Sequence, residues 1–74
     1  MAERYVVMGG SMNEPFFHSN DGWVSIEFRD AYLWNNLPLA QSCVRELTER
    51  LSEPVRSLSN WRVERLSDIQ EWYE

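Results

Sequence analysis

The side chains that most often perform catalysis are few and isolated in this 74-residue chain. His18 is the only histidine, and Ser19 follows it directly. Neighbouring residues of a strand point to opposite faces of a sheet, so this pair does not place a general base beside a nucleophile. We therefore expect His18 to be a solvated residue at a turn, and we expect that the chain is not an enzyme.

Cys43 is the only cysteine, and it falls on the apolar side of a predicted helix. A nucleophilic cysteine needs a lowered pKa and access to solvent, and burial in a helix provides neither. We expect Cys43 to be a small core residue. A single cysteine excludes an internal disulfide, and with one histidine it gives too few ligands for a Cys/His zinc site.

The acidic residues and glycines also lack the spacing of a known reaction centre. No pair of carboxylates is spaced for acid–base catalysis, and no run resembles a calcium-binding loop. Gly9-Gly10 lacks the later glycine and the lysine of a phosphate-binding loop. The sequence therefore predicts no cofactor and no metal.

The balance of charge indicates the kind of partner. Twelve acidic and seven basic residues give a net charge of −5, and every basic residue is arginine. Negative charge opposes direct binding of nucleic acid, whose affinity comes from cations that displace counterions. It suits contact with a basic protein surface, although a simply solvated acidic surface is the plainer interpretation. The absence of a long apolar run and of a recognisable signal peptide predicts a soluble, cytoplasmic protein.

Two surfaces are candidates for binding such a partner. Carboxylates along a helix or turn can meet the arginine and lysine side chains that otherwise hold phosphates. The first candidate is the outer face of the central helix, with Glu46, Glu49 and Glu53. The second is the terminal run 68–74, with Asp68, Glu71, Trp72 and Tyr73. Exposed aromatic and charged residues are typical of binding hot spots, but Ile69, Trp72 and Tyr73 at helical spacing would equally close one edge of a small core.

Short β-rich segments make up the first half of the chain. We expect strands over 4–8, 16–18 and 23–26, with a tight turn at Asp21-Gly22 between the second and the third. A turn over 28–31 is expected before a short strand over 32–34.

The second half combines helices with a last strand. Ala40, Val44, Leu47 and Leu51 recur at spacings of four, three and four, which predicts an amphipathic helix over 39–52. Asn36 is its expected N-cap, and Pro54 ends it. A polar connection over 55–60, anchored by Leu58, leads to a strand over 61–66. Ser67-x-x-Gln70 then predicts a capping box and a terminal helical turn.

Strands grouped before a helix favour an α+β fold in one domain, 1–74. We expect a small antiparallel sheet of three to four strands with one amphipathic helix packed on one face and a short C-terminal helical turn. A chain of this size offers one interface of about 800 Å² per partner. It can hardly also enclose a pocket of several hundred Å³.

The order of short motifs resembles that of small phage and prophage accessory proteins, including anti-CRISPR inhibitors. The motifs are Tyr5-Val6-Val7, Phe16-Phe17, Gly22-Trp23, Ala31-Tyr32-Leu33-Trp34, a helix with Ala40 and Leu47, and Trp61-Arg62-Val63. The helix entry Asn-Asn-Leu-Pro and the acidic end depart from that layout. The class shares no site, so no functional residue is carried over.

The resemblance implies a phage-encoded, non-enzymatic inhibitor that binds and blocks a bacterial nucleic-acid machine, most concretely a CRISPR-Cas surveillance complex in the host cytoplasm. The partner would be a host protein or ribonucleoprotein complex with a basic surface, without direct contact to nucleic acid or membrane. Two alternatives stay open, namely a modulator of host transcription or another regulator, and a self-associating structural module. Either a monomer or a homodimer is compatible with the sequence.

Overall fold

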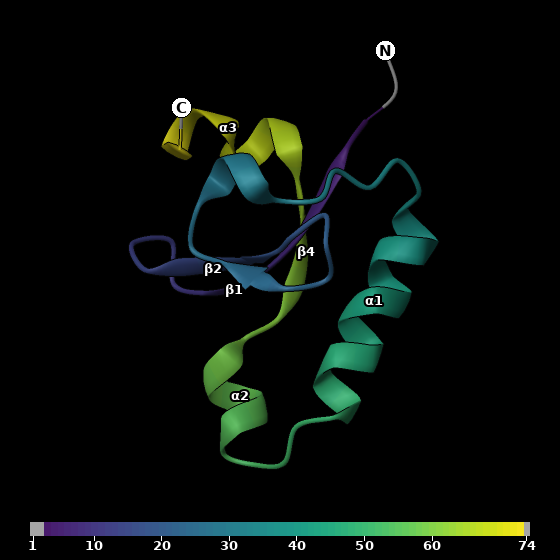
Figure 1. The fold of residues 1–74 in the computed structure, drawn as a ribbon, viewed down its shortest axis with the longest axis vertical. Coiled ribbons are helices and arrows are strands. Elements are labelled where there is room, and N and C mark those ends of the chain that lie inside the picture. The colour runs from purple at the N-terminus through teal and green to yellow at the C-terminus, as the bar shows by residue number, and fades with distance from the viewer. Residues whose placement is uncertain (1–2, 74) are drawn as a thin grey trace.

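The fold is built around β1 (Tyr5–Gly10), in which Val6, Val7 and Met8 are fully buried. The structure is a computed structural model that describes residues 3–73. It pairs β1 with β2 (Pro15–His18) and with β4 (Arg62–Arg65), and β3 (Val24–Ser25) joins the outer edge of β2. All three pairings are antiparallel, in the order β3-β2-β1-β4 (Figure 1).

One face of this sheet carries the main hydrophobic cluster. Val6 and Met8 point to the same side, because side chains alternate along a strand, and they pack with Phe17 and Ile69. The face is covered by α3 (Leu66–Tyr73) and by a 3₁₀ helix, η1 (Phe28–Asp30). The rings of Phe28 and Tyr73 stack with their centroids 5.3 Å apart. The C-terminal helix α3 therefore lies next to η1, which comes from the first half of the chain (Figure 1).

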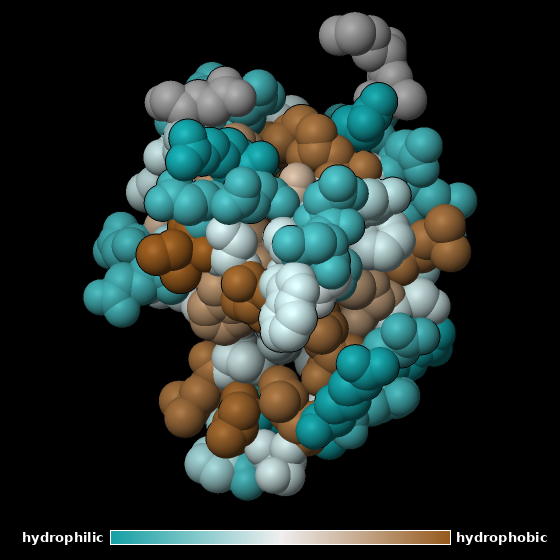
Figure 2. All heavy atoms as spheres, in the orientation of Figure 1, coloured by the Kyte–Doolittle hydropathy of each residue, from teal (hydrophilic) through white to brown (hydrophobic). Residues whose placement is uncertain are grey.

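The opposite face is covered by α1 (Leu37–Glu49), which contacts β1 and β4 and buries Ala40 completely. Asn36 caps this helix, and its Oδ1 accepts a hydrogen bond of 3.1 Å from the backbone N–H of Leu39. The short helix α2 (Val55–Ser59) also contacts β1. Figure 2 shows hydrophilic side chains gathered over α1 and apolar ones over α2, where Val55 and Leu58 are exposed.

The predicted fold class is confirmed, as are the Asn36 cap and the turn at 28–31, which is η1. Helix α1 ends at Glu49, before the predicted end at Ser52. The side chain of Arg56 reaches back here and donates to the carbonyl oxygens of Thr48 and Leu51, at 3.0 Å each from its Nε. The Thr48 carbonyl, which in a longer helix would accept from the N–H of Ser52, accepts instead from Arg56 and from the N–H of Leu51.

Three local predictions are wrong. Residues 55–59 form α2 rather than an irregular connection, and Leu58 is 77% exposed and anchors nothing. Ser67 is not an N-cap, because β4 runs directly into α3 at Leu66, whose N–H donates to the carbonyl of Arg4. The segment 32–34 is not a strand; isolated bridges pair Ala31 with Ser19 and Trp34 with Tyr5.

Candidate interaction surface

Of the three acids predicted on the central helix, two lie on it. Glu46 and Glu49 are exposed on α1. Glu53 lies beyond its end and accepts a 2.6 Å hydrogen bond from the hydroxyl of Ser57, which joins it to the first turn of α2. The helix face therefore offers two carboxylates to a partner rather than three.

The terminal segment divides between core and surface. Tyr73 belongs to the core, since its ring packs against Phe17 and its hydroxyl donates to the carbonyl of Met12 at 2.9 Å. Burial raises the pKa of this hydroxyl. Asp68 pairs with Arg65 at 3.1 Å. Trp72 is 62% exposed.

Glu71 is also exposed, and Asp68 remains exposed in its pair with Arg65, so the surface part of this segment is Asp68, Glu71 and Trp72. Because α3 and α1 cover opposite faces of the sheet, these residues and the acids of α1 do not form one surface. Residue 74 lies outside the described part of the chain.

His18 is not a solvated turn residue. It ends β2 in a half-buried position, with its ring centroid 6.1 Å from that of Trp34. Within residues 3–73, neither His18 Nδ1 nor Trp34 Nε1 is accessible to water or has a hydrogen-bond partner. Burial lowers the pKa of His18, and the nearby negative charge of Asp21 opposes that shift.

Cys43 is half-buried on α1, and burial, reinforced by Glu46, raises the pKa of its thiol. A raised pKa leaves little thiolate at neutral pH. Cys43 is not among the fully buried core residues, so the predicted core position is not reached.

A surface hollow of the described chain contains none of the site residues that the sequence predicts. It is an open hollow of about 810 Å³ between the β2–β3 turn and the segment that follows β3. We call it the aromatic hollow. It is lined by Ser19, Asn20, Asp21, Trp23, Val24, Ser25, Arg29, Asp30, Ala31, Tyr32 and Leu33. This hollow is open to solvent and is not an enclosed pocket.

The β2–β3 turn holds one side of the aromatic hollow in place. The backbone N–H of Ser19 donates to the carbonyl of Trp23 at 2.8 Å, and that of Gly22 donates to the carbonyl of Ser19 at 3.1 Å. Asp21 Oδ1 accepts from the Ser19 hydroxyl at 2.5 Å and from the backbone N–H of Trp23 at 3.1 Å. Gly22 has a φ of 86°, which favours glycine. The backbone of Trp23 is therefore fixed while its side chain is 75% exposed.

The segment after β3 forms the other side. The Ser25 hydroxyl donates to Asp30 Oδ2 at 2.9 Å and accepts from the backbone N–H of Glu27, which ties η1 to β3. The N–H of Tyr32 donates to the carbonyl of His18 at 3.0 Å. The Tyr32 ring meets Trp34 edge to face, with centroids 4.8 Å apart, and remains 38% exposed.

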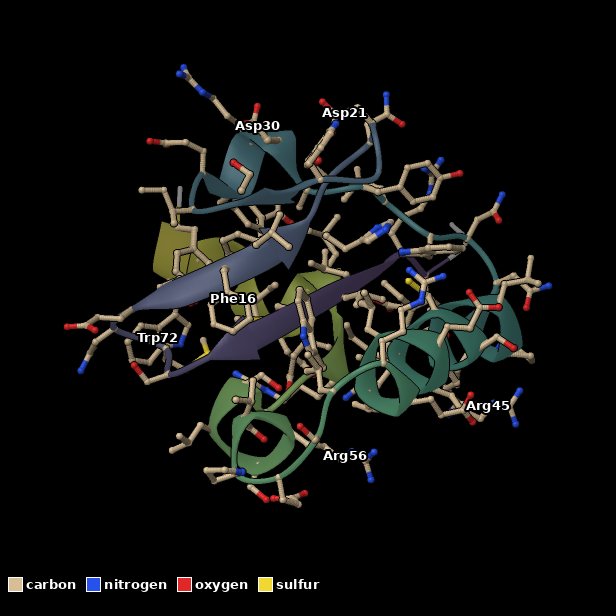
Figure 3. The ribbon with its side chains drawn as sticks, turned by 60° about the horizontal axis from the view of Figure 1, so that its bottom comes forward. Phe16, Asp21, Asp30, Arg45, Arg56 and Trp72 are labelled. Atoms are coloured by element: carbon tan, nitrogen blue, oxygen red, sulfur yellow. The ribbon has the colours of Figure 1, made fainter. Side chains whose placement is uncertain are left out.

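The charges of the aromatic hollow come from Asp21, Asp30 and Arg29. The pKa of Asp21 is lowered, first by the hydrogen bond from Ser19 and then by the backbone of Trp23, so this carboxylate is ionised at neutral pH. Figure 3 shows Asp21 and Asp30 on the same side of the strands, with Arg45 and Arg56 on the other side and Trp72 apart from both groups.

Sequence reasoning missed this surface because it combines two segments that touch only in the folded chain. The sequence predicts Trp23 at the start of one strand and Tyr32 in another. One signal was present in the sequence. An Asp-Gly turn followed at once by tryptophan places a large apolar side chain beside a solvent-exposed turn.

Comparisons with known proteins add no assignment: no family model, no curated protein and no solved structure matches this chain. Among residues 3–73, no three His, Cys, Asp or Glu side chains are grouped so that they could hold a metal ion. No helix in the same range has the length and apolar character needed to cross a bilayer.

Proposed function

We propose that this protein acts by binding another protein, and that its contact surface is the aromatic hollow. The observation that carries the proposal is a set of exposed apolar side chains around one hollow: Trp23, Val24, Tyr32 and Leu33. Hydrogen bonds hold the backbone of Trp23 and of Tyr32 in place. Tryptophan and tyrosine dominate binding hot spots. A backbone that is already ordered lowers the entropy lost on binding.

The proposed partner has a basic surface. The net charge of −5 attracts such a surface over long range and repels free nucleic acid. Proteins that hold a guide or target nucleic acid have basic surfaces of this kind. In accordance with the resemblance of the sequence, the proposed activity is non-enzymatic inhibition of a bacterial nucleic-acid machine in the host cytoplasm. The leading candidate is a CRISPR-Cas surveillance complex.

A plasmid-interference assay tests this function. The protein is expressed in bacterial strains that each carry one active CRISPR-Cas type, and transformation by a targeted plasmid is compared with that by an untargeted one. We expect expression to restore transformation by the targeted plasmid in at least one strain. Normal interference in every strain, with the protein present and folded, would contradict the inhibitor assignment.

Surface variants identify the contact. The double variant Trp23→Ala/Tyr32→Ala should lose inhibition. Charge reversal of the α1 acids, Glu46→Lys with Glu49→Lys, and removal of the terminal aromatic, Trp72→Ala, should retain it. Loss of inhibition in these last two variants, with the hollow variant still active, would place the contact on the surfaces predicted from the sequence instead.

A further inference from the structure

We propose that the aromatic hollow binds the guanidinium group of an arginine side chain that projects from the partner protein. This inference rests on the proposed function and specifies the chemical group that the surface recognises. Guanidinium is planar, stacks on aromatic faces and donates paired hydrogen bonds to a carboxylate. The aromatic hollow offers both kinds of partner, since its lining includes an indole ring, a phenol ring and two carboxylates.

The aromatic part of this site is Trp23 with Tyr32. Tryptophan is the aromatic side chain that attracts a cation most strongly. The indole of Trp23 is exposed although its backbone N–H and carbonyl are both bonded within the turn. Tyr32 is similarly fixed, by its backbone bond to His18 and its ring contact with Trp34. Neither segment must become ordered when a ligand arrives, so little conformational entropy is lost.

The carboxylates complete the site. Asp21 accepts its two bonds from Ser19 and Trp23 through Oδ1, and Asp30 accepts from Ser25 through Oδ2. A carboxylate has about four acceptor positions, so both groups retain capacity for a new donor.

The charge of the lining matches one incoming cation. Asp21 and Asp30 contribute two negative charges and Arg29 one positive charge, which leaves −1. One guanidinium neutralises this remainder. A phosphate would instead be repelled by two carboxylates and attracted by one arginine, so the charge balance favours the cation.

A titration with a minimal probe tests the assignment. The probe is the tripeptide Gly-Arg-Gly with blocked ends, and its control replaces arginine with citrulline, which keeps the shape and removes the charge. Binding is followed by NMR through the indole N–H signals of the four tryptophans, assigned from single Trp→Phe variants. We expect a saturable shift of the Trp23 signal with the arginine peptide, and binding at least about fivefold weaker for the citrulline peptide.

Asp21→Asn supplies the matched protein variant. Asparagine keeps the Oδ1 acceptor for Ser19 and Trp23, so the turn is preserved while the charge is lost. We expect this variant to bind the arginine peptide at least about fivefold more weakly. Glu46→Gln removes a carboxylate from the opposite side of the sheet and should bind as the unmodified protein does.

Several results would overturn the inference: equal affinity for the arginine and citrulline peptides, undiminished binding by Asp21→Asn, a response confined to Trp72, or a stronger response to inorganic phosphate than to the arginine peptide. The plasmid-interference assay distinguishes a failure of the arginine-binding inference from a failure of the proposed inhibitor function. Inhibition without arginine recognition rejects the present inference alone, whereas arginine recognition without inhibition rejects the inhibitor assignment.

Discussion

The two glycines at the end of β1 are explained by the atoms that lie next to them in the fold. The strand predicted over 4–8 ends before Gly9-Gly10, yet both glycines belong to β1. A Cβ atom at Gly9 would overlap the ring of Phe16 and lie 2.5 Å from the carbonyl oxygen of Ser59. At Gly9, glycine is required for the close packing of β2 and α2 against β1, whereas Gly10 has a φ of 75°, a conformation that favours glycine.

His18 makes stability depend on pH. Its pKa is lowered in the folded protein because burial disfavours the charged ring, while the unfolded chain has the ordinary value near 6.5. The unfolded state therefore binds more protons, so this contribution to stability is fully present above that value and is lost as the pH falls below it.

We accordingly expect the free energy of unfolding in urea to fall more between pH 7.5 and pH 5 in the unmodified protein than in His18→Phe. Phenylalanine retains a ring against Trp34 and does not titrate. An identical pH dependence in the two proteins would show that His18 has the same pKa folded and unfolded.

Among the elements, α1 has the clearest local signals. Its start is set by Asn36, whose side chain replaces the missing bond of an N-terminal N–H group. Beyond its end, the side chain of Arg56 in α2 donates to the carbonyls of Thr48 and Leu51, eight and five residues earlier in the chain. The start was predictable from the capping preference of asparagine, whereas no residue type in the sequence marks Glu49 as the last helical position.

Removal of the cap gives a prediction for this element. Asn36→Ala should lower the free energy of unfolding by about 1 kcal/mol, because the N–H of Leu39 loses its acceptor. Asn35→Ala, at the neighbouring exposed position, is the control and should change stability by less than about 0.5 kcal/mol. Urea denaturation measures both, and equal effects would mean that the Asn36 bond contributes nothing specific.

The whole molecule depends on a small core, since six hydrophobic side chains within the described residues are buried. Phe17 is the largest of them and contacts both η1 and α3 through Phe28 and Tyr73. A small domain is stabilised by only a few kcal/mol in total. A cavity at Phe17 therefore threatens the entire fold.

Phe17→Ala should lower stability by about 3–5 kcal/mol and leave much of the protein unfolded at 25 °C. Trp72→Ala removes a still larger aromatic side chain, but from the surface, and should change stability by less than about 1 kcal/mol. Circular dichroism during thermal unfolding distinguishes the two. A folded Phe17→Ala protein with an unchanged midpoint would disprove this account of the core.

Local sequence determined the elements whose signals lie within a few residues: the four strands, the Asp21-Gly22 turn, the Asn36 cap and the α+β class. These features follow from alternation, helical spacing and turn chemistry, which act over short distances.

Tertiary structure decided what depends on contacts between distant segments. It placed Tyr73 against the core and left Trp72 exposed. It also divided the predicted acids between opposite faces of the sheet and brought residues 19–25 beside 29–33 to form the aromatic hollow. The physical reason is that burial and the charge surroundings of a side chain are set by the packing of whole elements, and residue spacing along the chain does not specify how those elements pack.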